Sequence, residues 1–194
     1  MSKELKALAA KFKEADIRAV VGLGNPGPKY ETSRHNAGFL FLDYFADQLV
    51  AEPWTEDSNA LSSRADNPFE GTTNRNLFLI KPQTFMNTSG TAVAPLTRKG
   101  IKAKNILVVH DELEKPFGTI AMKLGGSARG HNGLKSIIEN IGYDFWRLRI
   151  GIGRPDKKEN TPDYVLQPFS EDELARLEQV FIDARLRISP GSNS

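Results

Sequence analysis

Short runs of apolar, often β-branched residues alternate along this chain with segments whose apolar residues recur at helical spacing. Apolar runs are typical of buried strands, and helical spacing is typical of helices with one buried face. The runs predict strands at residues 18–23, 76–80, 105–109, 119–124 and 147–152. The spacing predicts helices at residues 36–50, 132–140 and 170–187. This alternation indicates an α/β fold with a sheet covered on both faces.

Local signals refine the ends of the chain. Ser170 and Glu173 have the spacing of a capping box at the start of the last helix. Residues 1–17 predict a short amphipathic helix, an extension that precedes one domain at residues 18–194. This extension contains acids and lacks the apolar core of a secretory signal. Residues 51–74 are rich in loop signals and only weakly strand-like.

Composition excludes several classes of chemistry. The 194 residues, of which 39% are apolar, suit one packed domain. The chain has no cysteine, which excludes disulfides, thiolate nucleophiles and cysteine-ligated zinc. No apolar run approaches the length of a membrane span. We therefore expect no membrane association and a cytoplasmic location.

Charge is unevenly distributed although the net charge is only +2. Residues 115–158 carry nine Lys and Arg against three Asp and Glu, a net charge of +6. Residues 159–194 carry three against seven, a net charge of −4. A concentrated basic block is typical of a surface that binds a polyanion. Charge alone leaves open the alternative of a solvated basic face without a ligand.

A glycine-rich loop follows the first predicted strand and imitates a nucleotide site. Residues 22–27 (GLGNPG) match the G-x-G-x-x-G pattern of dinucleotide-binding proteins. In those proteins a helix begins at once, so that free N–H groups meet the pyrophosphate. Here Pro26 and Pro28 remove two N–H groups, and the next helix starts only near residue 36. We therefore expect no nucleotide cofactor, and instead a rigid loop that presents Asn25.

Each of the three histidines is followed by a carboxamide or carboxylate residue. Hydrolysis of an ester requires a base for water, a carboxylate that orients the base, and neutral donors for the oxyanion. His35 and Asp111 can supply the first two. Asparagines can supply the third. The absence of cysteine and of a G-x-S-x-G elbow favours direct attack by water over a covalent intermediate.

Two alternatives concern the same residues. His110 follows an apolar run, so it can be a hydrogen-bonded structural residue. The adjacent His110 and Asp111 can also belong to the site of a metal-dependent hydrolase. No tight ligand spacing accompanies them, so we expect no metal.

Seven motifs occur in the order found in one known family. They are VGLGNPGPKY (21–30), TSRHNAGF (32–39), KPQTFMNTSG (81–90), HDEL (110–113), KLGG (123–126), GHNGLK (130–135) and RLRIGIG (147–153). On these residues the chain resembles bacterial peptidyl-tRNA hydrolase. The resemblance implies a single three-layer α/β/α domain around a mixed, mostly parallel twisted sheet. It also implies a monomer without cofactor that recycles peptidyl-tRNA released early from ribosomes.

The resemblance implies catalytic roles by position. His35 matches the base that activates water, and Asp111 matches the carboxylate that orients it. Asn25, Asn87 and Asn132 match the polar groups that hold the peptide ester and the water.

Further positions match groups that bind the substrate. Phe85 and Met86 match part of the groove wall, although plain core packing explains them equally well. Tyr30 matches an aromatic residue that can stack on the terminal adenine. The groups expected near the tRNA 3′ end or its phosphates are His131, Lys123, Arg129 and Arg149.

Two positions depart from the family pattern. Ala121 replaces a basic residue that often lies two positions before the lysine matching Lys123. Arg129 occupies a place that is usually glycine. These changes leave one alternative, a non-hydrolytic relative of the same fold that binds RNA or a protein partner. Retention of His35, Asp111 and the three asparagines favours the enzyme.

Overall fold

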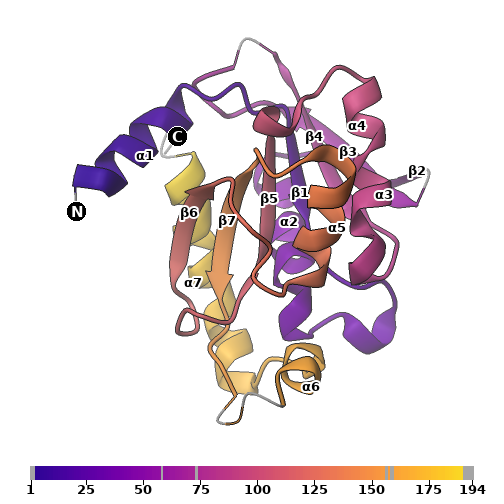
Figure 1. The fold of residues 1–194 in the computed structure, drawn as a ribbon, viewed down its shortest axis with the longest axis vertical. Coiled ribbons are helices and arrows are strands. Elements are labelled where there is room, and N and C mark those ends of the chain that lie inside the picture. The colour runs from indigo at the N-terminus through magenta and orange to yellow at the C-terminus, as the bar shows by residue number, and fades with distance from the viewer. Residues whose placement is uncertain (1–2, 58, 73, 156, 158–159, 190–194) are drawn as a thin grey trace.

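The computed structural model describes residues 3–57, 59–72, 74–155, 157 and 160–189. A seven-stranded sheet runs through its centre (Figure 1). Its strands are β1 (Ala19–Gly22), β2 (Thr55–Asp57), β3 (Ala60–Asp66), β4 (Asn76–Pro82), β5 (Ile106–Glu112), β6 (Ile120–Leu124) and β7 (Trp146–Gly151). The α-helices are α1 (Lys3–Lys13), α2 (Ala37–Gln48), α3 (Ser89–Val93), α4 (Pro95–Arg98), α5 (Asn132–Ile141), α6 (Thr161–Leu166) and α7 (Glu171–Ile188). The 3₁₀ turns are η1 (Pro28–Tyr30), η2 (Arg34–Asn36), η3 (Met86–Thr88) and η4 (Ala103–Asn105).

The sheet is mixed, with its parallel strands at the centre. The strand order is β2-β3-β4-β1-β5-β7-β6. The pairs β4–β1, β1–β5 and β5–β7 are parallel, whereas β2–β3, β3–β4 and β7–β6 are antiparallel. The predicted mixed α/β sheet is therefore confirmed. Since the four central strands are parallel, their carboxyl ends and the loops that follow them meet at one edge of the sheet.

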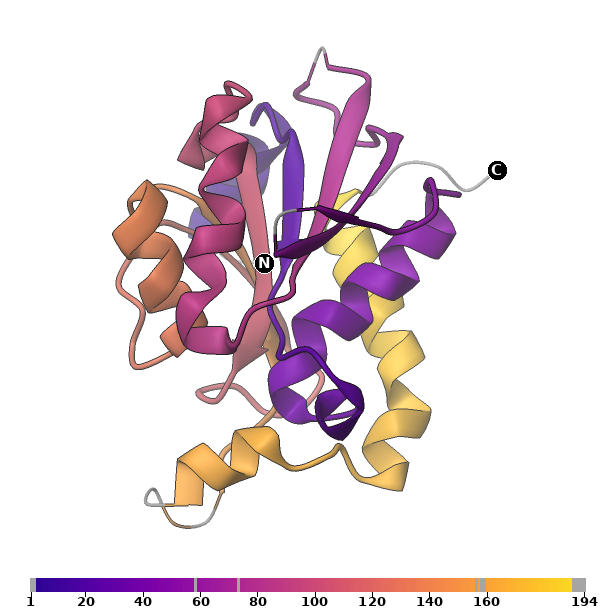
Figure 2. The ribbon, with the colours of Figure 1, turned by 90° about the vertical axis from the view of Figure 1, so that its right-hand side faces the viewer.

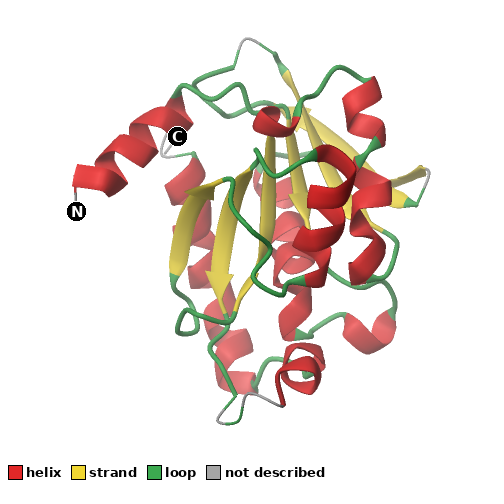
Figure 3. Cartoon of the chain, viewed as in Figure 1, coloured by secondary structure: helices red, strands yellow, loops and turns green. Residues whose placement is uncertain are grey.

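Helices cover both faces of the sheet (Figures 2 and 3). Two clusters of buried apolar residues form the core. Helices α2 and α7 pack on one face, where Phe41, Phe45 and Phe181 are buried. Helices α3, α4 and α5 lie on the other face, where Leu134 and Ile137 pack against strand residues. This is the expected three-layer α/β/α arrangement. Helix α6 lies beyond the carboxyl end of β7, away from α1 (Figure 1).

The predicted elements all occur, with shifted ends. Strand β5 continues through Glu112, so the prediction that it ends at residue 109 was wrong. His110 and Asp111 therefore lie inside a strand and not after it. The capping box of α7 is present, because Ser170 Oγ accepts the Glu173 N–H and the Glu173 carboxylate accepts the Ser170 N–H. Strands β2, at the edge of the sheet, and β3, beside it, lie in the segment predicted as loop-rich. Strand β2 is fully exposed and carries no apolar pattern.

Helix α1 lies outside the layered body except at its last turn. Phe12 is buried there, with its ring 4.9 Å from Trp146 and 5.8 Å from Phe69. The predicted end of the domain, residue 194, falls outside the described residues. Among the residues that are described, no helix has the length and apolar character needed to cross a membrane.

One residue at the end of α2 is strained. Val50 has φ of 50° and is 90% exposed. The Ala51 N–H donates to the Ala46 carbonyl, which places Val50 at the position of a Schellman cap where glycine is favoured. A β-branched side chain resists this left-handed conformation.

We predict that Val50→Gly raises the free energy of unfolding by about 0.5–1 kcal/mol, because relief of left-handed strain exceeds the added freedom of the unfolded chain. Urea denaturation measures this difference. Val50→Thr is the matched control, since it keeps the branched Cβ and should leave the stability near that of the parent. A loss of stability in Val50→Gly would contradict the prediction.

Candidate active site

The three histidines lie near one another at the carboxyl edge of the central strands. His35 is in η2, which follows the loop after β1, and His110 is inside β5. His131 immediately precedes α5. The centre of the His131 ring is 4.9 Å from that of His35 and 5.1 Å from that of His110. The fold thus gathers side chains from three separate segments.

One oxygen of Asp111 joins two of these histidines. Asp111 Oδ1 lies 2.8 Å from Nδ1 of His35 and 3.0 Å from Nε2 of His131. Asp111 is 3% exposed, and His35 is 9% exposed. A carboxylate that has lost its hydration needs such partners to remain charged. The structure therefore brings together the pair predicted to form the base and its orienting acid.

This pairing shifts the pKa of both groups. Burial lowers the pKa of His35, but the charge and the hydrogen bond of Asp111 outweigh it and leave the pKa raised. Burial raises the pKa of Asp111, but His35 and His131 together hold it well below its usual value. Asp111 is therefore a carboxylate near neutral pH, and an imidazolium at His35 is stabilised beside it.

His110 has different surroundings. Its Nδ1 lies 2.6 Å from the carbonyl oxygen of Asp111, which makes this nitrogen the donor. Burial, and then the neighbouring His131, lower the pKa of His110 to about 3. Its Nε2 is buried without a hydrogen-bond partner within the described chain. These contacts fit the alternative in which His110 is a structural residue.

A glycine sets the distance between His35 and Asp111. A Cβ on Gly38 would lie 2.4 Å from the nitrogen of Leu23 and 2.4 Å from the carbonyl oxygen of Val109. Any side chain at this position would push the start of α2 away from β1 and β5. Because His35 lies three residues before Gly38, its imidazole would move away from Asp111 as well.

Asn36, which the sequence did not single out, fixes the position of Asn25. The Asn36 Oδ1 accepts the Asn25 N–H at 2.8 Å, and the Asn36 Nδ2 donates to the Asn25 carbonyl at 3.0 Å. The Asn25 Oδ1 in turn accepts the Met86 N–H at 2.8 Å. This orients the Asn25 carboxamide so that its Nδ2, which has no partner in the described chain, can donate to a ligand. The position of Asn36 next to His35 was the signal that could have found it.

The other predicted substrate-binding residues differ in exposure. Phe85 is 63% exposed, whereas Met86 is 5% exposed and packs in the core between the sheet and α5. The core-packing alternative therefore describes Met86 well and Phe85 poorly. Asn87 and Asn132 are exposed at the starts of η3 and α5. Tyr30 is half-buried in η1, with the Lys29 amine 5.5 Å from its ring centre.

A basic cavity of about 440 Å³ opens beside His35, Asp111 and His131. Of the predicted site residues, its walls also include Asn132, Lys123, Arg129 and Arg149. Asn25, Tyr30, Phe85, Met86 and Asn87 do not line this cavity. The predicted residues thus form two regions that meet at the histidines. One is the cationic cavity, and the other is the surface around Asn25 and Phe85.

The cations of this cavity come mainly from strands β6 and β7. Lys123 stands opposite Arg147, and Ala121 stands opposite Arg149. Burial and then the nearby arginines lower the pKa of Lys123. A second lysine at position 121 would face Arg149 directly, and like charges opposite each other destabilise a sheet. Ala121 therefore avoids a repulsion inside an already crowded positive cluster.

Two of the arginines already interact with other groups of the protein. Arg147 donates to the backbone carbonyls of Gly126 and Ser127 and holds the loop between β6 and α5. Arg149 lies 3.3 Å from the carboxylate of Glu112. Arg129 is exposed in that loop with φ of 47°, a conformation that suits the glycine usual at this place.

Arg34 is a second residue that the sequence did not single out. Its guanidinium donates to Glu173 at 2.6 Å and to the Pro168 carbonyl, and it lies 4.6 Å from the ring centre of Tyr164. The backbone of Arg34 also donates to the Gln167 carbonyl. The turn that carries His35 is thereby tied to the segment between α6 and α7. Only its adjacency to His35 hints at this role in the sequence.

His35, Asp111 and His131 also have the composition of a metal site, with their ligand atoms within 4.8 Å of one another. The hydrogen bonds argue against that use. Nδ1 of His131 accepts N–H groups from Gly133 and Leu134, so the proton of its neutral ring is on Nε2 and points to Asp111. A metal bound at that Nε2 would require an imidazolate.

Comparison with known proteins identifies similar sequences and structures. The sequence profile described as peptidyl-tRNA hydrolase matches residues 19–189. The peptidyl-tRNA hydrolase of Moorella thermoacetica is 47% identical over 170 residues, which are 87% of each chain. That of Treponema pallidum is 48% identical over 82% of this chain and 79% of its own. The crystal structure of the Acinetobacter baumannii peptidyl-tRNA hydrolase superposes with a TM-score of 0.80, at 36% identity, covering 91% of this chain and 90% of that one.

We predict that stability falls with acid between pH 6 and pH 4.5 because of His110. The unfolded chain binds a proton on this histidine near pH 6.5, whereas the native state does not until about pH 3, so the native state is favoured less as the pH falls. The expected slope is about 1.4 kcal/mol per pH unit. The raised pKa of His35 makes the free energy of unfolding depend on pH above this pH range. The lowered pKa of Asp111 does so below it.

His110→Asn tests this prediction by urea denaturation across the same pH range. The asparagine amide can still donate to the Asp111 carbonyl but cannot titrate. The dependence of unfolding free energy on pH should flatten by about one proton. An unchanged slope would show that another group causes the acid sensitivity.

Proposed function

This chain belongs to the peptidyl-tRNA hydrolase family, and on that basis we propose that His35 is the general base of its reaction. The reaction is hydrolysis of the ester that joins a peptide to the 3′-terminal ribose of tRNA. The observation that carries the proposal is the buried hydrogen bond of 2.8 Å between His35 Nδ1 and Asp111. Because Nδ1 is the donor in that bond, Nε2 of the neutral ring is a base at the cavity wall.

The proposed step begins when Nε2 of His35 removes a proton from water as the water attacks the ester carbonyl. The imidazolium that forms is stabilised by Asp111, which stays ionised. The Nδ2 of Asn25 and the carboxamides of Asn87 and Asn132 are the proposed donors to the carbonyl oxygen and the water. The proton then passes to the ribose oxygen as the ester bond breaks.

We propose that the two regions of the site divide the substrate between them. The cationic cavity suits the phosphates of tRNA, and its contacts through Lys123, Arg129 and Arg149 would not read sequence. The exposed ring of Phe85 suits the peptide side, and Tyr30 is the candidate to stack on the terminal adenine. Such division fits an enzyme that recycles many tRNAs after early release from ribosomes.

We further propose action as a monomer in the cytoplasm, where ribosomes generate the substrate, and without a metal. The proton on Nε2 of His131 supports direct use of His35 over metal hydrolysis. The non-hydrolytic alternative is not favoured, because the family and its named relatives are hydrolases.

We predict that His35→Ala lowers kcat by a factor of about a hundred or more, as loss of a general base should. The measurement is release of the peptide from an N-blocked aminoacyl-tRNA in the presence of a chelator. Near-normal kcat in His35→Ala would show that another group is the base. Loss of the parent activity on chelation would instead revive the metal-dependent mechanism.

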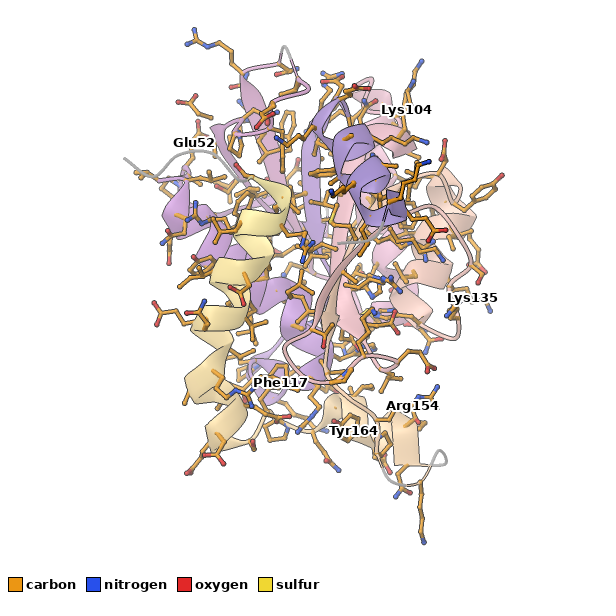
Figure 4. The ribbon with its side chains drawn as sticks, turned by 90° about the vertical axis from the view of Figure 1, so that its left-hand side faces the viewer. Glu52, Lys104, Phe117, Lys135, Arg154 and Tyr164 are labelled. Atoms are coloured by element: carbon orange, nitrogen blue, oxygen red, sulfur yellow. The ribbon has the colours of Figure 1, made fainter. Side chains whose placement is uncertain are left out.

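Lys123→Ala tests the proposed binding of tRNA phosphates in the cationic cavity. We predict that this variant raises KM for full-length substrate several-fold and leaves KM for a short 3′-end mimic nearly unchanged, because phosphate contacts away from the ester are lost. Lys135→Ala is the matched control, since Lys135 is in the same basic block but projects outward from α5 (Figure 4). Equal effects of both substitutions would indicate general charge attraction only.

A further inference from the structure

His131 makes two sets of hydrogen bonds with opposite ends of its ring. Its Nδ1 accepts the N–H groups of Gly133 at 3.2 Å and of Leu134 at 3.4 Å, so the imidazole is the N-cap of α5. Its Nε2 lies 3.0 Å from Asp111 Oδ1. A nitrogen that accepts N–H bonds carries no proton, so the neutral ring has its proton on Nε2.

The helix therefore determines which way the His131 proton points. A proton on Nδ1 would face two backbone N–H groups at the positive end of the helix dipole and would remove the cap. Helix α5 is itself held in place, because a Cβ on Gly133 would lie 2.4 Å from the Met86 sulfur. The donor that His131 offers to Asp111 is thus fixed in both position and identity.

We propose that His131 is a positioning residue for catalysis, whose cap on α5 locks an Nε2–H donor onto the same Asp111 oxygen that orients His35. This inference rests on the proposed function and goes beyond it, since the family resemblance placed His131 with the groups that bind tRNA. The two donors share one oxygen, so each weakens the hold of Asp111 on the other. His131 thereby limits how strongly Asp111 stabilises the protonated form of His35 and keeps His35 available as a base at lower pH.

Other titratable groups surround the cluster. Asp111 is the carboxylate within hydrogen-bond distance of His35 and His131 in the described chain, and His110 lies next to it. From α6, Tyr164 donates to the Ile152 carbonyl, and from α2, Asp43 is paired with Lys81. The other charged groups lining the cavity are Glu112, Glu114, Lys123, Arg129, Arg147, Arg149 and Arg154. All of these stay the same in substitutions of His131, so their influence cancels in the comparison.

Two isosteric substitutions separate the cap from the donor. In His131→Asn the carboxamide oxygen takes the place of Nδ1 and keeps the cap, but nothing reaches Asp111. In His131→Gln the carboxamide nitrogen takes the place of Nε2 and can donate to Asp111, but the cap acceptor is lost. A residue with a merely structural role would respond only through stability.

We predict that His131→Asn keeps Tm close to that of the parent and raises the pKa of His35 by about half to one unit. This is less than the roughly one to two units that a hydrogen bond to a charged group is worth, because His131 acts on His35 only through the shared Asp111. The acid limb of the kcat/KM profile moves to higher pH by the same amount as the pKa of His35. His131→Gln should instead lower Tm by about 2–4 °C and keep the acid limb at the pH of the parent.

Ring ¹⁵N NMR of the full chain tests the inference without substrate, because only three histidines need assignment. We expect the neutral His131 ring as the Nε2–H tautomer, and a His35 titration that shifts upward in His131→Asn. An Nδ1–H tautomer, or an unshifted His35 titration with only KM raised, would overturn the proposal. These results stand whether or not the chain hydrolyses peptidyl-tRNA, so failure of the proposed function is recognised separately by the His35→Ala assay.

Discussion

The buried negative charge of Asp111 is the constraint around which the site is arranged. A carboxylate that is 3% exposed must be compensated by donors that arrive from outside its own strand. Two imidazoles from different segments donate to the same oxygen of Asp111, and the approach of each segment depends on a glycine. Gly38 lets the turn with His35 come against β5, and Gly133 lets the helix capped by His131 come against Met86. The glycines of the TSRHNAGF and GHNGLK motifs therefore determine how His35 and His131 meet Asp111, although neither glycine has a side chain.

This arrangement divides the site into two regions of different chemistry. The wall formed by β6 and β7 concentrates cations, of which Arg149 is paired with a carboxylate and Arg147 holds backbone carbonyls. The opposite region presents carboxamides and an exposed aromatic ring, with Asn25 held by Asn36. This asymmetry matches the proposed division of a substrate that is a polyanion at one end and a peptide at the other, and His35 lines the cationic cavity.

The apolar pattern was sufficient to predict the central sheet and its main helices, because a buried parallel strand requires an uninterrupted apolar run. It failed at β2, an exposed edge strand, and at β3, whose small and polar residues are only partly buried. It also failed at the end of β5, where three polar residues continue the strand. His35 and Asp111 were predictable from chemistry and motif. For Asn36 and Arg34 the only sequence signal was adjacency to His35, because their roles depend on contacts with other segments, Asn25 for Asn36 and residues 167–173 for Arg34. The hydrogen bonds of His131 to both Asp111 and the start of α5 were likewise not predictable, because they depend on the residue at which α5 begins.

The clamp of Arg34 on the segment between α6 and α7 affects how the protein becomes active during its own synthesis. The turn that carries His35 is made early, but its backbone and guanidinium partners are Gln167, Pro168 and Glu173. Because a nascent chain emerges from its amino end, these residues leave the ribosome more than a hundred residues after the turn does. Until then the guanidinium of Arg34 lacks the carboxylate of Glu173 with which it pairs in the folded protein. A nascent copy of this protein therefore completes the contacts of the turn that carries His35 only after residues 167–173 have been synthesised.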